Sequence, residues 1–360
     1  MSDPLLGKVA GAFLAETILG RLGAPDPQVL VAPQAGVDIG VLRVAPGIVM
    51  AATTDPVFIL PSLGWERAAW FAVHILASDA ATSGLPLRAM SVDLNLPPEL
   101  SDADLGTMWE SYAGACADLG ITVLTGHTAR YAGCTWPMVG GATCIAIGAE
   151  DAYVAPTMAR SGDHLVVTKG AAIEATALLA ASFPDQLRSS VDEQTLAAAQ
   201  ALLGAMTVVP EARVAAAYGV RDAGVTAMHD ATEGGVLGGL WELADAAGLG
   251  IRVERAAIPV RPEVAAVCAA AEIDPYLSIS EGTLIISVRP GHAQGVLAAV
   301  NGAGIEAADV GELLPADAGR TLIIDGRAGP LAPPALDPYW AAVARLSGDS
   351  QGPRPRRPFR

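Results

Sequence analysis

The sequence predicts an α/β or α+β protein with two domains, and three observations support this prediction. The chain has 360 residues, and a chain of this length is expected to form two domains rather than one. Strand-like apolar segments alternate with helical segments in both halves of the chain. Hydrophobic residues make up 52% of the sequence and charged residues 17%, which supports a sizeable core and argues against disorder over most of the chain.

The first half of the sequence predicts three helices and five strands. Residues 5–22 have apolar side chains near one helical face, and residues 65–83 indicate a buried helix. Ser101 and Asp104 form a capping-box-like start for a helix that continues to about residue 119. Strands are expected at the apolar or alternating segments 37–44, 47–55, 88–97, 121–126 and 137–148.

A polar, turn-rich stretch at 150–162 separates this half from a second series of strands and helices. Strands are expected in the second half at 164–170, 225–230, 250–254, 283–288, 305–312 and 320–324. Helices are expected there at 172–182, 192–205, 211–218, 234–247, 262–271 and 291–302. We therefore expect domains at 1–155 and 156–325 and a carboxy-terminal extension at 326–360, disordered from about residue 347.

Charge and composition argue against nucleic acid and membrane as partners. The net charge of −16 argues against non-specific nucleic-acid binding, which depends on Lys and Arg, although the end of the chain at 352–360 is basic. Residues 131–149 carry no charge, but Gly and Pro interrupt them, so strands are expected there rather than a membrane span.

The amino-terminal sequence and the cysteines indicate a cellular compartment. The start of the chain lacks the pattern of a signal peptide. The four cysteines have no C-x-x-C spacing, which is typical of free thiols in a reducing compartment. We expect a cytoplasmic protein with no membrane segment.

Five short phrases place polar groups where apolar segments stop: GVDIG (36–40), TTDP (53–56), SDAA (78–81), GHTARY (126–131) and HDATEGG (229–235). The first three supply carboxylates at Asp38, Asp55 and Asp79, each beside small residues that leave room for phosphate oxygens. Carboxylates at the ends of such elements suit Mg²⁺, and Mg²⁺ in turn suits ATP. Taken singly, each aspartate could instead be an ordinary turn or cap residue.

The fifth phrase leaves a strand at His229-Asp230, turns through Thr232 and enters a helix through Gly234 and Gly235. A helix N-terminus offers unpaired N–H groups and a positive dipole end, which suit an anion. The alternative is that Asp230 or Thr232 merely caps the helix. The glutamate between Thr232 and Gly234 would oppose an anion.

Three further residues are candidates for chemistry, each with a structural alternative. His127 could be a general base, a ligand or a hydrogen-bonded core histidine, and Glu281 could take a proton from a substrate or be a solvated turn residue. Lys8 could reach a phosphate or be an exposed helix lysine. No GxxxxGK[ST] motif is present, so a Walker-type phosphate loop is excluded.

The order of these phrases, together with IPVRPEV (258–264) and EGTL (281–284), resembles the aminoimidazole ribonucleotide (AIR) synthetase superfamily. The similarity covers about residues 5–315 and is closest to the carbamoyl dehydratases of hydrogenase maturation, within a divergent AIR synthase-related group. It implies a PurM-like fold whose amino-terminal domain pairs with a second copy into a β-barrel-like core. It also implies ATP and Mg²⁺ in a cleft covered by the amino-terminal segment.

The resemblance also assigns roles to individual residues. It implies that Asp38, Asp55 and Asp79 bind Mg–ATP, that Lys8 lies in the covering segment and that Glu281 is a base. It places His229, Asp230 and Thr232 in the loop of the second domain, with Gly234 and Gly235 following. The G-H-T phrase corresponds to the family's G-D-T, so Thr128 is counted with the nucleotide-binding residues.

Several departures from the family pattern bear on function. His127 replaces an aspartate, Ser78 an asparagine and Glu233 an arginine, and the terminal cysteine that carries the carboxamide of the hydrogenase enzyme is absent. We expect an ATP- and Mg²⁺-dependent enzyme that phosphorylates an oxygen of a separate small molecule or partner. A non-catalytic nucleotide-binding scaffold and a thiamine-monophosphate-kinase-like phosphotransferase stay open as alternatives.

Overall fold

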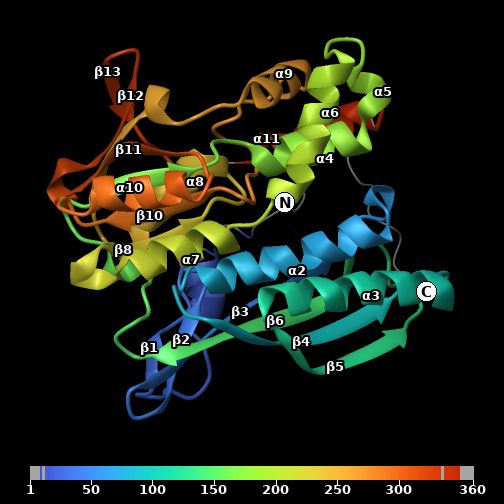
Figure 1. The fold of residues 1–360 in the computed structure, drawn as a ribbon, viewed down its shortest axis with the longest axis horizontal. Coiled ribbons are helices and arrows are strands. Elements are labelled where there is room, and N and C mark those ends of the chain that lie inside the picture. Colours follow the sequence, from blue (N-terminus) through green and yellow to red (C-terminus); the bar gives the residue numbers. More distant parts are fainter. Residues whose placement is uncertain (1–8, 10–12, 334–335, 349–360) are drawn as a thin grey trace.

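The computed structural model describes residue 9, residues 13–333 and residues 336–348 of the chain. Two β-sheets with their helices form two halves, the first below and the second above in Figure 1. Helix α2 (Trp65–Ala81) lies between the two sheets. It packs on the first sheet and also contacts elements of the second half.

The first sheet has six strands in the order β1-β2-β3-β6-β4-β5. Their bounds are β1 (Val29–Val31), β2 (Gly40–Ala45), β3 (Ile48–Phe58), β4 (Leu87–Leu96), β5 (Thr122–Arg130) and β6 (Met138–Ala149). Neighbouring strands are antiparallel except β4 and β5. Helices α2 and α3 (Asp102–Leu119) cover one face, and no described helix covers the other (Figure 1). The alternation of buried and exposed residues along β3 and β4 follows from this one-sided cover.

The second sheet has seven strands in the order β13-β12-β9-β11-β7-β10-β8. Their bounds are β7 (His164–Thr168), β8 (Val225–Asp230), β9 (Gly250–Glu254), β10 (Leu284–Val288), β11 (Ala307–Leu314), β12 (Arg320–Ile324) and β13 (Arg327–Pro330). The helices of this half are α4 (Ile173–Ser182), α5 (Pro184–Leu187), α6 (Glu193–Ala201), α7 (Val209–Tyr218), α8 (Gly235–Ala246), α9 (Pro262–Ala270), α10 (Ala293–Gly302) and α11 (Pro338–Leu346). Strands β8 and β10 are buried at every position, because helices pack on both of their faces.

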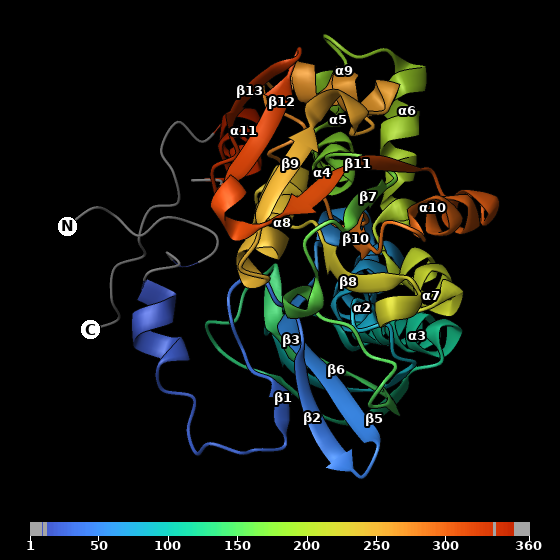
Figure 2. The same cartoon turned by 90° about the vertical axis from the view of Figure 1, so that its left-hand side faces the viewer.

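Short 3₁₀ helices connect these elements, and a π-helix precedes them. The 3₁₀ helices are η2 (Pro61–Leu63), η3 (Pro156–Met158), η4 (Leu202–Ala205), η5 (Arg221–Ala223), η6 (Arg255–Ala257) and η7 (Ala316–Ala318). The π-helix η1 (Leu14–Leu19) has no buried residue and stands apart from both sheets in Figure 2.

The two halves share one hydrophobic core. Phe71 and Leu76 of α2 belong to the same continuous cluster of buried side chains as Met228 of β8 and Val209 of α7. A smaller cluster fills the space between α8 and the second sheet. Because apolar side chains are buried across the boundary, the two halves pack as one body.

The predicted mixed α/β fold is confirmed, and most predicted elements are present within a few residues of their expected bounds. The predicted cap of α3 is also confirmed, since Ser101 Oγ accepts a hydrogen bond from the Asp104 N–H at 3.1 Å. Strand β5 extends to Arg130, beyond its predicted end, because polar residues continue a strand whose outer face is uncovered.

Other elements differ from the prediction. Strands β1 and β13 and helices α5 and α11 were not expected, because each is short and lacks a long periodic pattern. Part of the helix expected at 5–22 lies outside the described residues, and its described part is η1.

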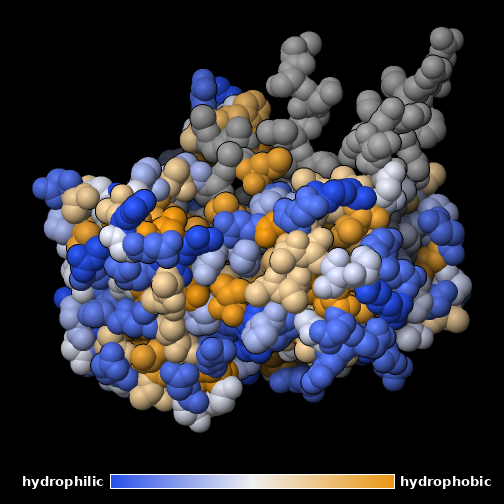
Figure 3. Space-filling model, turned by 90° about the horizontal axis from the view of Figure 1, so that it is seen from above, coloured by the Kyte–Doolittle hydropathy of each residue, from blue (hydrophilic) through white to orange (hydrophobic). Residues whose placement is uncertain are grey.

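Among the described residues, no single helix is both long and apolar enough to cross a membrane. The segments Glu193–Ala205 and Val209–Tyr218 reach that length and hydropathy only when taken together, and the chain bends by 55° between them. Viewed from above, the surface shows hydrophobic residues in small groups among hydrophilic ones (Figure 3).

Candidate functional site

Three aspartates of the first half converge near the boundary with the second half. Asp38 precedes β2, Asp55 lies on β3, and Asp79 lies in the last turn of α2. Thr53 and Asp55 share the face of β3 that α2 covers, and Thr53 Oγ1 donates a hydrogen bond of 2.9 Å to Asp79 Oδ2. The negative charges of Asp55 and Asp38 both act on Asp79, so the structure brings the three predicted carboxylates together.

The end of β8 brings a histidine and a fourth aspartate to the same place. His229 Nδ1 lies 2.6 Å from Asp38 Oδ2, and His229 Nε2 lies 3.1 Å from Glu242 Oε2 of α8. One ligand atom each from Asp38, His229 and Asp230 lies within 4.8 Å of the others. Both ring nitrogens of His229 lie beside carboxylates, so the two aspartates are the members of this group that can offer oxygens to a cation. Both halves of the chain therefore contribute to the site.

Two carboxylates of this site are buried without a hydrogen-bond partner among the described residues. Both oxygens of Asp230 and both oxygens of Glu281 are in this state, and each residue is about 1% exposed. Glu281 precedes β10, the strand that pairs with β8. Because an unpartnered buried carboxylate is strongly unfavourable, such groups indicate a bound cation or a catalytic role.

The acidic groups raise one another's pKa values. Burial, and then the charges of Asp230, Asp55, Asp38 and Glu281, raises the pKa of Asp79 well above its ordinary value. Burial and the charge of Asp38 raise the pKa of Asp230 to about 7, although His229 opposes this shift. A divalent cation would remove this repulsion.

The neighbouring carboxylates favour the charged form of His229, whereas they disfavour the charged forms of Asp79 and Asp230. Burial by itself lowers its pKa, but the carboxylates of Asp38 and Glu242 outweigh burial and raise the pKa well above 6.5. The raised pKa favours the doubly protonated ring, in which each nitrogen donates a hydrogen bond to one carboxylate.

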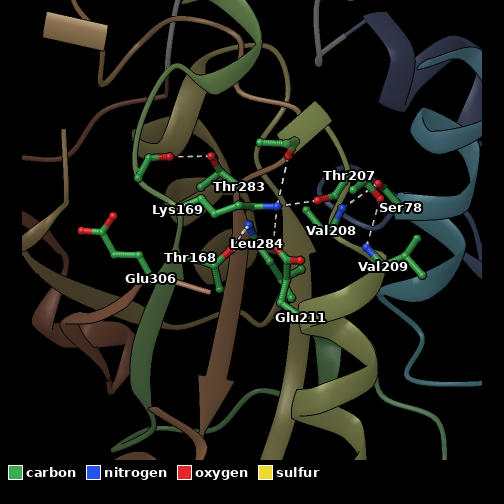
Figure 4. Close-up of polar contacts among 12 residues, drawn as sticks. Ser78, Thr168, Lys169, Thr207, Val208, Val209, Glu211, Thr283, Leu284 and Glu306 are labelled. Carbon is green, nitrogen blue, oxygen red and sulfur yellow. Dashed lines mark hydrogen bonds and ion pairs between the residues drawn. The ribbon is translucent and has the colours of Figure 1, made fainter. Parts of the chain in front are cut away.

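A buried lysine lies close to Glu281. Lys169 Nζ donates to Thr207 O at 2.5 Å and to Ala205 O at 3.1 Å, and it forms an ion pair of 2.6 Å with Glu211 Oε1 (Figure 4). Burial and nearby carboxylates raise the pKa of Glu281, and the charge of Lys169 opposes this shift.

Ser78 connects this network to the first half of the chain. Its Oγ accepts a hydrogen bond of 3.0 Å from the Val208 N–H (Figure 4). Its hydroxyl also interacts with the Glu281 carboxylate and lowers the pKa of that group. The serine that replaces the family's asparagine is thus buried at the boundary between the halves and contacts Glu281.

Residues at the start of α11 form hydrogen bonds with the loop between β8 and α8. The Gly234 N–H donates to Asp337 Oδ2 at 2.8 Å, and Trp340 Nε1 donates to Glu233 Oε1 at 3.2 Å. The Gly234 N–H, which we expected to be available to an anion, is therefore hydrogen-bonded to a carboxylate of the chain itself. The Gly235 N–H bonds to Thr232 O at 3.0 Å.

Gly235 is required by packing. Its φ is +63°, and a Cβ at this position would lie 2.7 Å from the carbonyl oxygen of Tyr276. Only glycine fits there without a shift of the backbone.

The structure does not bring His127 to the carboxylates. His127 lies opposite Asp93 in the pairing of β5 with β4, and both residues are exposed on the uncovered side of the first sheet, whereas Asp79 lies on the covered side. His127 Nε2 lies 2.9 Å from the hydroxyl of Tyr131. Thr128 is the next residue of β5 and is also exposed. Lys8 lies outside the described residues.

The uncovered side of the sheet carries a shallow depression of about 360 Å³. It is lined by Thr54, Ser91, Val92, Asp93, Thr125, Gly126, His127, Gly141, Ala142 and Thr143. This depression is separate from the carboxylate cluster.

Family models match both halves of the chain. The model described as "AIR synthase related protein, N-terminal domain" matches residues 36–157, and the corresponding C-terminal domain model matches residues 160–323. The chain belongs to the AIR synthase related family. Its two-domain pattern and mixed α/β sheets are those of the PurM-like fold.

Relatives of this AIR synthase related protein include enzymes of different activities. Carbamoyl dehydratase HypE of Rhizobium leguminosarum bv. viciae is 28% identical over 282 residues, which are 76% of this chain and 75% of that protein. The selenide, water dikinase of Geobacter metallireducens is 25% identical over 337 residues, 86% of this chain and 93% of that protein.

Solved structures are similar over most of the chain. The crystal structure of Escherichia coli HypE has a TM-score of 0.64 and 28% identity, covering 80% of this chain and 87% of that chain. The structure of AaThiL complexed with AMPPCP and TMP has a TM-score of 0.62 and 18% identity, covering 81% of this chain and 88% of that chain, which is a likeness of fold alone.

Sequence reasoning missed several residues of the site in this AIR synthase related chain: Lys169, Glu174, Glu211, Glu242 and Asp337. A usable signal was present for Lys169, which is the one lysine or arginine in the predicted strand 164–170 and follows its apolar residues 165–167 closely. Glu174 likewise lies in an apolar helix. No local pattern distinguished Asp337, because its role comes from a contact with a loop 103 residues earlier.

Proposed function

We propose that this chain is an ATP- and Mg²⁺-dependent enzyme that phosphorylates an oxygen of an amide, carboxamide or phosphate group. The substrate is a small molecule or a partner protein, and the phosphorylation drives dehydration, cyclisation or phosphotransfer. Membership of the AIR synthase related family and the similarity to a carbamoyl dehydratase and a dikinase support an ATP-using reaction. The observation that carries the proposal is the group of buried carboxylates, two of them unpartnered, where the halves meet.

The carboxylate cluster fits a hard divalent cation. Asp38, Asp55 and Asp79 supply oxygen ligands from three separate elements, and both oxygens of Asp230 lack a partner among the described residues. We propose that the first three aspartates hold Mg²⁺ with the ATP phosphates. The ion would neutralise negative charge on the transferring phosphoryl group.

Glu281 is the group that we assign to proton transfer. It is buried, and burial together with the charges of Asp230 and Glu174 raises its pKa, while the hydroxyl of Ser78 and the charge of Lys169 oppose the rise. An ionised Glu281 can accept the proton of a substrate N–H or O–H. His127 lies on the uncovered side of the first sheet, so we assign it no part in proton transfer within this chain.

We also propose that the chain forms a homodimer through the uncovered face of the first sheet. This face carries Leu42, Met50, Ile145 and Ile147 at positions that alternate with the buried ones, and no described helix packs on it. An apolar sheet face of this kind is expected to be covered by a second sheet. Sedimentation equilibrium tests the dimer, and a monomer at 100 μM would contradict it.

Ligand-dependent stability tests nucleotide binding. Melting is measured with ATP and Mg²⁺ together and with each alone. A ligand at 100 times its dissociation constant stabilises the native state by about 2.7 kcal/mol, so only the combination is expected to raise the melting temperature by several degrees. Asp79→Asn should remove most of this shift, whereas Asp118→Asn, an exposed change on α3, should leave it unchanged.

Formation of ADP from Mg–ATP over a panel of amides, carboxamides and phosphate esters tests catalysis. Asp79→Asn and Glu281→Gln should each abolish it. Binding of Mg–ATP without ADP formation for every compound would favour the non-catalytic scaffold. Absence of any melting shift would overturn both proposals.

A further inference from the structure

Glu281 lies in a tight turn whose backbone is held at several points. The Thr283 N–H donates to Ser280 O at 2.9 Å, and the hydroxyls of Ser280 and Thr283 lie 2.7 Å apart. Gly282 has a φ of +102°, and a Cβ there would lie 2.4 Å from the carbonyl oxygen of Ala205. This turn leads directly into β10, so the direction of the Glu281 side chain follows from the turn geometry.

Residues 173–175, in the first turn of α4, each form a hydrogen bond with residues 279–281. The Ile173 N–H donates to Ser280 Oγ at 3.1 Å, and the Ala175 N–H donates to Ile279 O at 3.0 Å. Between them, the side chain of Glu174 accepts a hydrogen bond of 3.0 Å from the Glu281 N–H through its Oε2. The helix N-terminus thus satisfies its own unpaired N–H groups with the turn, and Glu174 completes the contact in the reverse direction.

We propose that Glu174 is the positioning residue of Glu281. The inference rests on the role proposed above for Glu281. Apart from the nearby hydroxyl of Ser78, no described side chain adjoins the Glu281 carboxylate as a hydrogen-bond donor, so contacts to its backbone contribute to its position. The hydrogen bond to Glu174 Oε2 is such a contact at Glu281 itself, made by a side chain 107 residues away in the sequence.

Burial and nearby charges of Glu174 explain how its side chain can lie next to another acidic residue, Glu281. The pKa of Glu174 is raised to about 8, because burial and the charges of Asp337, Glu233 and Asp230 together outweigh the hydrogen bond from Glu281, which lowers it. At pH 7 most molecules therefore carry a proton on Glu174. A neutral carboxyl group still accepts the N–H of Glu281 but adds no negative charge beside its carboxylate.

Amide hydrogen exchange of Glu281 in the full chain tests the contact without ATP or substrate. In Glu174→Ala the Glu281 amide should exchange at least about tenfold faster than in the wild type, because its acceptor is gone. In Glu174→Gln it should stay within about threefold of the wild type, because the Gln carbonyl still accepts. Glu174→Asp, one methylene shorter, serves if the alanine variant does not fold. The amide of Val166 in β7 is the control and should not change.

Turnover supplies the second measurement. With a substrate that supports ADP formation, Glu174→Ala should lower kcat by about tenfold to a hundredfold with the KM for ATP within twofold, because misplacement of a reacting group acts on the chemical step. Glu174→Gln should restore kcat at pH 7. Unchanged exchange at Glu281 in Glu174→Ala, or loss of turnover in Glu174→Gln equal to that in Glu174→Ala, would overturn the inference. If Mg–ATP is never consumed, the proposed function fails, and the exchange rates alone decide whether Glu174 holds Glu281.

Discussion

His229 Nδ1 and Asp38 Oδ2 lie 2.6 Å apart, and this contact joins two residues 191 positions apart from the two halves of the chain. Glu242 accepts from the other ring nitrogen at 3.1 Å, so a protonated ring lies between two carboxylates. His229 is almost fully buried, which makes its charge dependent on both partners. The same contact places Asp38, one of the proposed Mg²⁺ ligands, beside Asp230.

Removal of one carboxylate partner should therefore destabilise the protein. For Asp38→Ala we expect a loss of about 2–3 kcal/mol in the free energy of unfolding, because His229 keeps a buried positive charge with one partner fewer. Urea denaturation at pH 7 measures this, with the exposed change Asp118→Ala as control. A loss below 0.5 kcal/mol would show that the ion pair contributes little to joining the halves.

Replacement of Glu281 by Gln should stabilise the protein while it removes activity. The pKa of Glu281 is raised in the folded state, so stability is lost as pH rises from the unfolded value through the folded one. Gln carries no charge, and we expect a gain of about 1–3 kcal/mol at alkaline pH and a smaller gain at pH 5. Thermal melts of both proteins from pH 5 to pH 9 test this, and a gain that does not grow with pH would contradict the raised pKa.

His74 should make stability fall in mildly acidic solution. Burial, and then the charges of Arg213 and Lys169, lowers its pKa to about 4, while its Nδ1 lies 2.8 Å from Thr207 Oγ1. The unfolded state binds a proton near pH 6.5 and the folded state only near pH 4, so this group's contribution is present above pH 6.5 and is lost as pH falls toward 4.

The His74→Phe variant isolates this contribution. Phe can still stack on Trp70, whose ring centroid lies 3.9 Å from that of His74, but it does not titrate. We expect the stability difference between wild type and variant to shrink by about 2 kcal/mol between pH 7 and pH 5. A difference that is constant over this range would mean that His74 titrates alike in the folded and unfolded states.

Lys169 and Glu211 should behave as a coupled buried pair. Glu211 is fully buried, and one of its oxygens has no partner among the described residues. Lys169→Met removes the positive charge that pairs with its other oxygen. We expect a loss of about 3–5 kcal/mol. The double variant Lys169→Met, Glu211→Gln should recover at least half of it, because no unpaired buried charge is left. Equal losses in the single and double variants, measured by urea denaturation, would refute the coupling.

The carboxylates at the ends of elements could be predicted from the sequence because local patterns mark those ends. Asp38, Asp55 and Asp79 each follow or end an apolar segment, and the structure brings all three into one cluster. His229 and Asp230 end the strand that was predicted at 225–230, and the structure buries every residue of that strand. Periodicity of two or 3.6 residues is a property of neighbouring residues, so it can be read without knowledge of the fold.

The position of His127 could not be predicted in the same way. Its phrase is as strongly marked as the others, yet β5 is an edge strand, and His127 points to the side of the sheet that α2 does not cover. Which face of a sheet receives a helix depends on the packing of residues distant in the sequence. A shift of one residue along β5 would have placed the ring on the other side.

The sequence by itself therefore determined the mixed α/β class and the order of most strands and helices, and it pointed to the aspartates of the proposed Mg–ATP site, because each of these depends on short-range periodicity and composition. Only the tertiary structure decided that His229 pairs with Asp38, that Asp337 closes the loop before α8, and that Glu174 holds the backbone of Glu281. These contacts join residues 103 to 191 positions apart. Burial of a shared core brings such residues together, and no local pattern of residues encodes that meeting.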